Sequence, residues 1–138
     1  MPIEIMTRRP ETWEVIRLYR AAGLRRATHD PEMIARMITG ASLVVSARSD
    51  GHLVGLARSI TDFCHSCYLA DLAVDPCFQK QGIGRSLVLR TKHEVGGTTQ
   101  LFLLSAATAE TFYTRFMELT PETCFQIART YPAGPQAG

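Results

Sequence analysis

The residues best suited to phosphate chemistry lie between Leu72 and Leu87. An apolar segment, Leu72-Ala73-Val74, is followed by a turn at Asp75-Pro76 and then by Gln79-Lys80-Gln81-Gly82-Ile83-Gly84-Arg85. A strand that runs through a glycine-containing loop into a helix brings backbone N–H groups and the positive end of the helix dipole to one point. Glycines at 82 and 84 let the backbone approach an anion without an intervening Cβ. The stretch therefore predicts a phosphate site.

Two common nucleotide-binding motifs do not fit this stretch. A P-loop needs Gly-x-x-x-x-Gly-Lys-Ser/Thr, which the chain lacks. A Rossmann fingerprint needs a third glycine three residues after Gly84, where this chain has Leu87. The phosphate ligand is therefore of another class.

The stretch resembles the acyl-CoA-binding motif of the GNAT superfamily of N-acyltransferases. In that family a strand ending in Val-x-Pro precedes Gln/Arg-x-x-Gly-x-Gly/Ala and a helix. Here Val74-Asp75-Pro76 supplies the approach, and Gln79, Gly82 and Gly84 occupy the fixed positions. The resemblance implies transfer of an acetyl group from acetyl-CoA, as co-substrate, to the primary amine of a small molecule or peptide by direct attack, without a metal. A non-catalytic acyl-CoA-binding or regulatory domain of the same fold is the alternative.

The same resemblance implies where acyl-CoA binds. In the family the pantetheine arm lies between splayed fourth and fifth strands and bonds to the backbone of the fourth, here at Leu72 and Val74. The pyrophosphate rests on the N–H groups of the loop, with charge from Lys80 and Arg85. The implied acyl-CoA-binding residues are Leu72, Ala73, Val74, Gln79, Lys80, Gln81, Gly82, Ile83, Gly84 and Arg85.

A second family pattern, Ala-x-x-Phe-Tyr, matches the residues from Ala109 to Tyr113. The resemblance implies that Tyr113 lies near the thioester sulfur, where a phenol can protonate the departing thiolate. The alternative role for Tyr113 is packing of an aromatic ring on a helix face. The family continues Tyr-x-x-x-Gly-Phe, but no glycine lies between Tyr113 and Leu119, so we expect the segment after Tyr113 to be reshaped.

The general base remains open between several interpretations. Asp71 precedes the implied CoA-binding segment and is the first candidate, although a strand-end carboxylate bonded to a neighbouring loop fits equally well. His65 is a second candidate, and a water chain without a dedicated base is a third. The acceptor pocket is expected from the first two helices and the loop 61–66, which carry Arg25, Arg26, His29, Asp62 and Phe63 in no pattern that names a substrate.

Cys64 and Cys67 form a Cys-x-x-Cys pair without a second pair at zinc-finger spacing. A thioredoxin-type pair opens a helix, whereas this one enters an expected strand. We interpret the pair as two reduced thiols.

Periodicity and turn signals predict alternating elements. Strands are expected at 3–5, 43–48, 53–60, 67–74, 101–104 (buried) and 125–129, and Asp50-Gly51 marks a hairpin. Helices are expected from Pro10 to Gly23, from Asp30 to Gly40, from the glycine loop to Glu94, and over 111–119. This order is α+β around one mixed, mostly antiparallel sheet flanked by helices, and matches the GNAT element order.

Composition sets the remaining expectations. A chain of 138 residues that is 46% hydrophobic suits one domain, taken as 1–132, with a flexible tail at 133–138. A net charge of +2 is too small to favour nucleic acid or a membrane surface. The N-terminus lacks a signal-peptide core, which favours the cytoplasm, and a homodimer is compatible with the fold.

Overall fold

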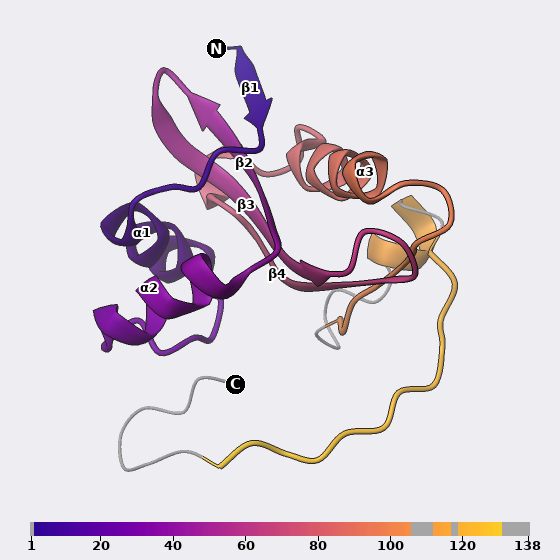
Figure 1. Ribbon diagram of the computed structural model, residues 1–138. Helices are drawn as coiled ribbons and strands as arrows, with labels where there is room; N and C mark the ends of the chain where they lie inside the picture. The colour runs from indigo at the N-terminus through magenta and orange to yellow at the C-terminus, as the bar shows by residue number, and fades with distance from the viewer. Residues whose placement is uncertain (1, 106–111, 117–118, 131–138) are drawn as a thin grey trace.

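Five strands form one sheet in the order β1-β2-β3-β4-β5 in the computed structural model, which describes residues 2–105, 112–116 and 119–130 (Figure 1). The first four strands pair antiparallel, and β5 is parallel to β4. This is the predicted α+β fold with a mixed sheet. The elements in chain order are β1 (Ile3–Met6), α1 (Thr12–Ala22), α2 (Pro31–Gly40), β2 (Leu43–Ser49), β3 (His52–Thr61), β4 (Ser66–Val74), η1 (Pro76–Phe78), α3 (Ile83–Val95), β5 (Gln100–Phe102) and η3 (Phe112–Phe116).

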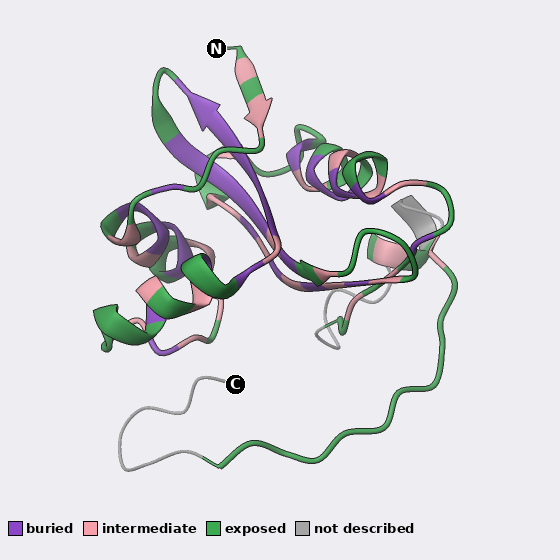
Figure 2. Cartoon of the chain, viewed as in Figure 1, coloured by how far each residue is buried: buried purple, intermediate pink, exposed green. Residues whose placement is uncertain are grey.

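The helices divide between the two faces of the sheet. Helices α1 and α2 cover one face and α3 covers the other, as Figure 1 shows, and each layer encloses a separate apolar core. Strand β2 is buried along its whole length because both layers cover it (Figure 2). Leu56 faces the α1–α2 core, whereas Ala57 faces the α3 core, as strand alternation requires.

Most sequence signals act where they were expected. Asp50 and Gly51 both have positive φ, 50° and 79°, which is the geometry of a tight β2–β3 hairpin. Asp30 caps α2 by accepting the Met33 N–H at 3.1 Å. The expectation that α1 starts at Pro10 was wrong: it starts at Thr12, because the Glu14 carboxylate accepts the Glu11 N–H at 2.9 Å and fixes the cap there.

Gly55 sets the distance between β3 and α3. A Cβ at this position would lie 3.0 Å from Leu87 Cδ1 and 3.1 Å from Ile83 Cγ2. The absence of a side chain therefore lets the first turns of α3 lie directly on the strand. This contact fixes the N-terminus of α3, and with it the glycine loop.

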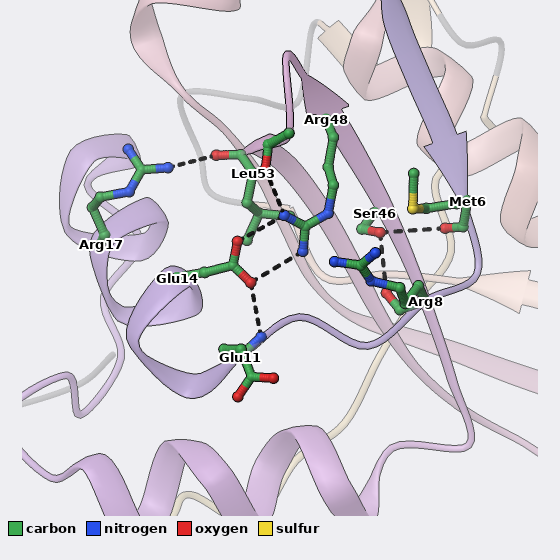
Figure 3. Close-up of polar contacts among 9 residues, drawn as sticks. Met6, Arg8, Glu11, Glu14, Arg17, Ser46, Arg48 and Leu53 are labelled. Atoms are coloured by element: carbon green, nitrogen blue, oxygen red, sulfur yellow. Dashed lines mark hydrogen bonds and ion pairs between the residues drawn. The ribbon is translucent and has the colours of Figure 1, made fainter.

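A buried ion pair ties α1 to the sheet. Arg48 on β2 donates to both carboxylate oxygens of Glu14 on α1, at 2.7 and 3.1 Å (Figure 3). The same guanidinium donates to the Gly51 carbonyl at 2.9 Å, and Arg17 donates to the Leu53 carbonyl at 2.8 Å. The hydrogen bond from Arg48 and its charge lower the pKa of Glu14 despite burial. These contacts orient α1, which also carries a residue of the candidate site.

The expected buried strand at 101–104 was wrong in extent and burial. Strand β5 covers only Gln100–Phe102, and Phe102 and Leu104 are exposed. An apolar run cannot distinguish a buried strand from an edge strand, because periodicity carries no information about neighbours. Only β4 pairs with β5 among the described residues.

The chain after β5 departs most from the expectation. Within the expected helix 111–119, the described residues form a π-helical turn at Phe112–Phe116. The expected strand at 125–129 was wrong: the segment 119–130 has no regular structure, and Phe125 and Ile127 are 91% and 100% exposed. Strand-forming side chains do not make a strand without a partner edge, and none adjoins this segment in the described part of the chain. The expected tail 133–138 lies outside the described residues.

Candidate active site

A gap in the sheet defines the centre of the candidate site. Strand β5 pairs with β4 only from Ser66 to Tyr68. From Leu69 to Val74, β4 keeps β3 on one side and has no strand on the other among the described residues. The backbone of Leu72 to Val74 is thus available along this edge to a ligand that binds as an extra strand.

The glycine loop lies at the end of this open edge. Gly82 caps α3 with φ of 82°, Lys80 also has positive φ, and the first helical bond runs from the Ser86 N–H to the Gly82 carbonyl at 3.0 Å. The described residues offer no hydrogen-bond acceptor to the six consecutive backbone N–H groups from Lys80 to Arg85. Such a row of donors, at the positive end of a 13-residue helix, is suited to binding an anion.

Hydrogen bonds of the residues that precede the glycine loop hold it in place. The Asp75 N–H donates to the Val54 carbonyl at 2.8 Å, and the Asp75 carboxylate accepts the Cys77 N–H at 2.9 Å. The Gln79 side chain donates to the Val74 carbonyl at 3.1 Å, so it connects the loop to the last residue of β4. The anion site and the open strand edge therefore form one continuous surface.

Asp71 lies beside the gap with its side chain fully buried. It accepts hydrogen bonds from Tyr19 on α1 at 2.7 Å, from Arg26 at 2.7 Å and from Arg58 on β3 at 2.6 Å. Burial opposes ionisation of this carboxyl, but the hydrogen bond and charge of Arg58, with Arg26 and Tyr19, lower its pKa. A carboxylate so stabilised is a weak proton acceptor, and its contacts favour a positioning role.

A β-bulge puts Asp71 on this face. Arg58 pairs with Asp71 and Ser59 pairs with Leu69, which leaves Ala70 as an extra residue in β4. Cys67 and Leu69 face the α3 core, and strict alternation would direct Asp71 there as well. The extra residue turns Asp71 to the α1–α2 face, next to Tyr19.

Tyr113 lies on the η3 turn, half-buried, beside a hollow of 830 Å³ lined by residues of β5, the segment 103–105 and the segment 119–125. Its ring packs edge-on against Phe112 at a centroid distance of 5.5 Å. Burial raises the pKa of the Tyr113 hydroxyl, so it stays protonated at neutral pH. The residues 106–111, which complete the Ala-x-x-Phe-Tyr pattern, lie outside the described part of the chain.

The remaining sequence candidates are dispersed. The Asp62 carboxylate accepts hydrogen bonds from three backbone N–H groups, including that of His65 at 2.8 Å, and these donors lower its pKa. Cys64 is exposed and Cys67 is buried, and neither is bonded to another cysteine. No three His, Cys, Asp or Glu side chains gather as a metal site among the described residues. In the same residues, no helix has the length and apolar character needed to cross a membrane.

Comparison with known proteins decides the family. The model of the acetyltransferase (GNAT) domain matches residues 17–128, most of the chain. The chain belongs to the GNAT acetyltransferase family. No curated protein sequence matches it.

Solved GNAT structures show the same fold. A GNAT family acetyltransferase from Streptococcus pneumoniae TIGR4 is 25% identical with a TM-score of 0.76, covering 94% of this chain and 100% of that one. A probable acetyltransferase from meticillin-resistant Staphylococcus aureus is 18% identical with a TM-score of 0.78 and the same coverage. The PaiA N-acetyltransferase from Thermoplasma acidophilum, solved with coenzyme A, is 19% identical with a TM-score of 0.61 and covers 84% of this chain and 89% of that one.

Two residues at this GNAT site were missed by the sequence interpretation. Tyr19 lies in the expected helix from Pro10 to Gly23 and Arg58 in the expected strand 53–60, and neither was singled out as a site residue. The available signal was a charged residue inside the mostly apolar strand 53–60, where burial of a cation requires a partner.

Proposed function

We propose that this GNAT domain transfers an acetyl group from acetyl-CoA to a primary amine by direct attack. The observation that carries the proposal is the row of free N–H groups from Lys80 to Arg85 at the end of an unpaired strand edge. The pyrophosphate binds the loop formed by Gln79 to Arg85, and the pantetheine arm bonds to the backbone from Leu72 to Val74. The thioester then lies in the gap beside Asp71.

The chemistry requires one bond to form and one to break. The neutral amine nitrogen attacks the thioester carbonyl, the C–S bond breaks, and Tyr113 donates its proton to the departing thiolate. The raised pKa of Tyr113 supports this role, because the phenol holds its proton at neutral pH. The proton of the amine leaves through water, since the low pKa of Asp71 does not favour proton uptake there.

A non-catalytic acyl-CoA-binding module is the second candidate. The observation that favours it is the irregular segment 119–130, which follows Tyr113 in place of a strand. This candidate predicts CoA binding without transfer.

Thiol release from acetyl-CoA over a panel of primary amines separates the two functions. We expect release with at least one amine, and a decrease of at least about tenfold in kcat for Tyr113→Phe with CoA affinity unchanged. Phe112→Leu, beside Tyr113 but without a proton to donate, is the matched control. CoA binding without release on any amine supports the binding module, and a Tyr113→Phe protein as fast as the native one removes Tyr113 from the mechanism.

A further inference from the structure

The clamp around Asp71 contains more positive than negative charge. Two guanidinium groups, of Arg26 and Arg58, meet one carboxylate, and Tyr19 is neutral because burial, together with the charge and hydrogen bond of Asp71, raises its pKa well above its ordinary value. No other carboxylate pairs with either arginine among the described residues. One positive charge is therefore uncompensated in a largely buried setting, where an anion is attracted strongly.

The two arginines differ in their unused donors. Arg26 donates through Nε to Asp71, through Nη1 to the Arg25 carbonyl and through Nη2 to the Ala70 carbonyl. Arg58 donates through Nε to Asp71 at 2.6 Å and also makes a side-chain hydrogen bond with Tyr19, and its side chain is 11% exposed. Unlike Arg26, Arg58 has no hydrogen bond to a backbone carbonyl among the described residues. A guanidinium has five N–H donors, so Arg58 retains donors beyond those bonded to Asp71 and Tyr19, and these can bind a carboxylate.

An apolar row adjoins these donors. Ile60 pairs with Tyr68 across β3 and β4, and Tyr68 pairs with Phe102 across β4 and β5. The rings of Tyr68 and Phe102 stack with centroids 5.2 Å apart, and Ile60 and Phe102 are exposed. Ile60 is two residues from Arg58 on the same strand and therefore on the same face.

This face is the one from which an acceptor reaches the thioester. The glycine loop leads into α3, which covers the opposite face, so the acyl-CoA approaches from that side. Asp71, which pairs with Arg58, comes three residues after Tyr68, where β5 ceases to pair with β4. The Arg58 guanidinium and the apolar row thus border the opening of the gap.

We propose that the acceptor is an amine that carries a carboxylate and an apolar side chain, as an apolar amino acid does, and that Arg58 binds the carboxylate while Ile60, Tyr68 and Phe102 contact the side chain. This inference rests on the proposed function and names its substrate class. Arg58 acts as a specificity residue: Asp71 holds its Nε, and the Nη groups face the acceptor.

Binding of reaction products tests the inference without requiring turnover. N-acetylphenylalanine, N-acetylphenylalaninamide and N-acetylglycine are titrated calorimetrically into the full chain saturated with CoA. These compounds lack a basic amine, so differences in amine pKa do not enter. We expect the phenylalanine acid to bind about 10- to 100-fold more tightly than its amide, the range for a charge-assisted hydrogen bond, and more tightly than N-acetylglycine.

Two Arg58 variants and a control variant test whether Arg58 causes the preference for the acid over the amide. Arg58→Gln is expected to reduce the acid-over-amide preference to near unity with CoA affinity unchanged. Arg58→Lys keeps the charge next to Asp71 and is expected to fold and to reduce the preference several-fold, since it lacks the planar donor pair. Arg36→Gln removes an exposed arginine from α2 and should keep the full preference.

Several results overturn the inference. Equal binding of acid and amide to the native chain does so, as does the absence of measurable binding by any acid at millimolar concentration. An undiminished preference in both Arg58 variants also does so. The proposed function fails separately, on thiol release: acids that bind preferentially while no amine is acetylated would leave the anion site intact and reject transfer.

Discussion

Replacement of Asp71 by asparagine distinguishes a positioning carboxylate from a general base. The carboxylate is fully buried and accepts three hydrogen bonds of 2.6–2.7 Å, two of them from guanidinium groups. Asparagine keeps one acceptor oxygen but turns an NH₂ group toward a donor, and it leaves two buried cations without a counter-charge. Breaking a buried ion pair from one side costs about 3–5 kcal/mol, a large part of the stability of a typical domain.

The cost is measurable by urea unfolding. With a slope of about 2 kcal/mol per molar, the expected loss lowers the unfolding midpoint by about 2 M. Glu94→Gln is the matched control, because it breaks a surface pair with Arg90 at 2.9 Å and should cost less than about 0.5 kcal/mol.

The pH dependence gives a second measurement of the same contacts. The folded-state pKa of Asp71 is lower than its value in the unfolded chain. Its stabilising contribution is therefore complete above the unfolded pKa, about 3.9, and is lost as the pH falls through the folded pKa. Asp71→Asn should remove this part of the acid destabilisation. If the variant unfolds within about 1 kcal/mol of the native chain at neutral pH, the clamp does not hold the fold and Asp71 regains its place as a candidate base.

Two further predictions concern the donor site and α1. Gly82→Val should raise the Kd for CoA at least about tenfold, and it should lower the free energy of unfolding by about 1–2 kcal/mol, because backbone strain at positive φ is all that opposes a side chain there. The control Gly23→Val, with φ of 72° and equally open surroundings, should show the loss of stability alone. Unchanged CoA affinity in Gly82→Val would reject the phosphate site. Arg48→Met should lower the free energy of unfolding, measured in urea, by about 3 kcal/mol, because it leaves Glu14 buried without its partner. Adding Glu14→Gln should restore part of this stability. Equal stability of the single and double variants would contradict the ion-pair argument.

The sequence predicted the structure correctly where a particular backbone conformation or cap requires a particular type of residue. Gly82 needs positive φ, Asp30 caps a helix, and Asp50-Gly51 forms a tight turn. Each requirement restricts the residue at its own position, so a single sequence reveals it. The donor half of the candidate site is of this kind, because the main chain supplies its hydrogen bonds.

The acceptor half could not be predicted in the same way. Tyr19, Arg26 and Arg58 reach Asp71 from positions 52, 45 and 13 residues away along the chain. No local pattern encodes such a meeting, and a buried arginine in a strand reveals only that it needs a partner. The strand predicted after Tyr113 was wrong for a related reason. Its apolar and polar residues alternate as in a strand, but a strand also needs a neighbouring strand to pair with, and that depends on the whole fold.

One inserted residue connects both halves of the site. Ala70 has no counterpart on β3, and a bulge of this kind bends a strand and increases its twist. The pairing of β4 with β5 ends at Tyr68, just before the bulge, so the bend accounts for the divergence that leaves this edge of β4 open. The same insertion turns Asp71 from the α3 core to Tyr19 and the two arginines, which places their positive charge on the α1–α2 side of that opening. Strict strand alternation would place Asp71 on the wrong face of the sheet. The bulge at Ala70 corrects this, and it thereby brings Asp71 and the two positively charged arginines together beside the gap.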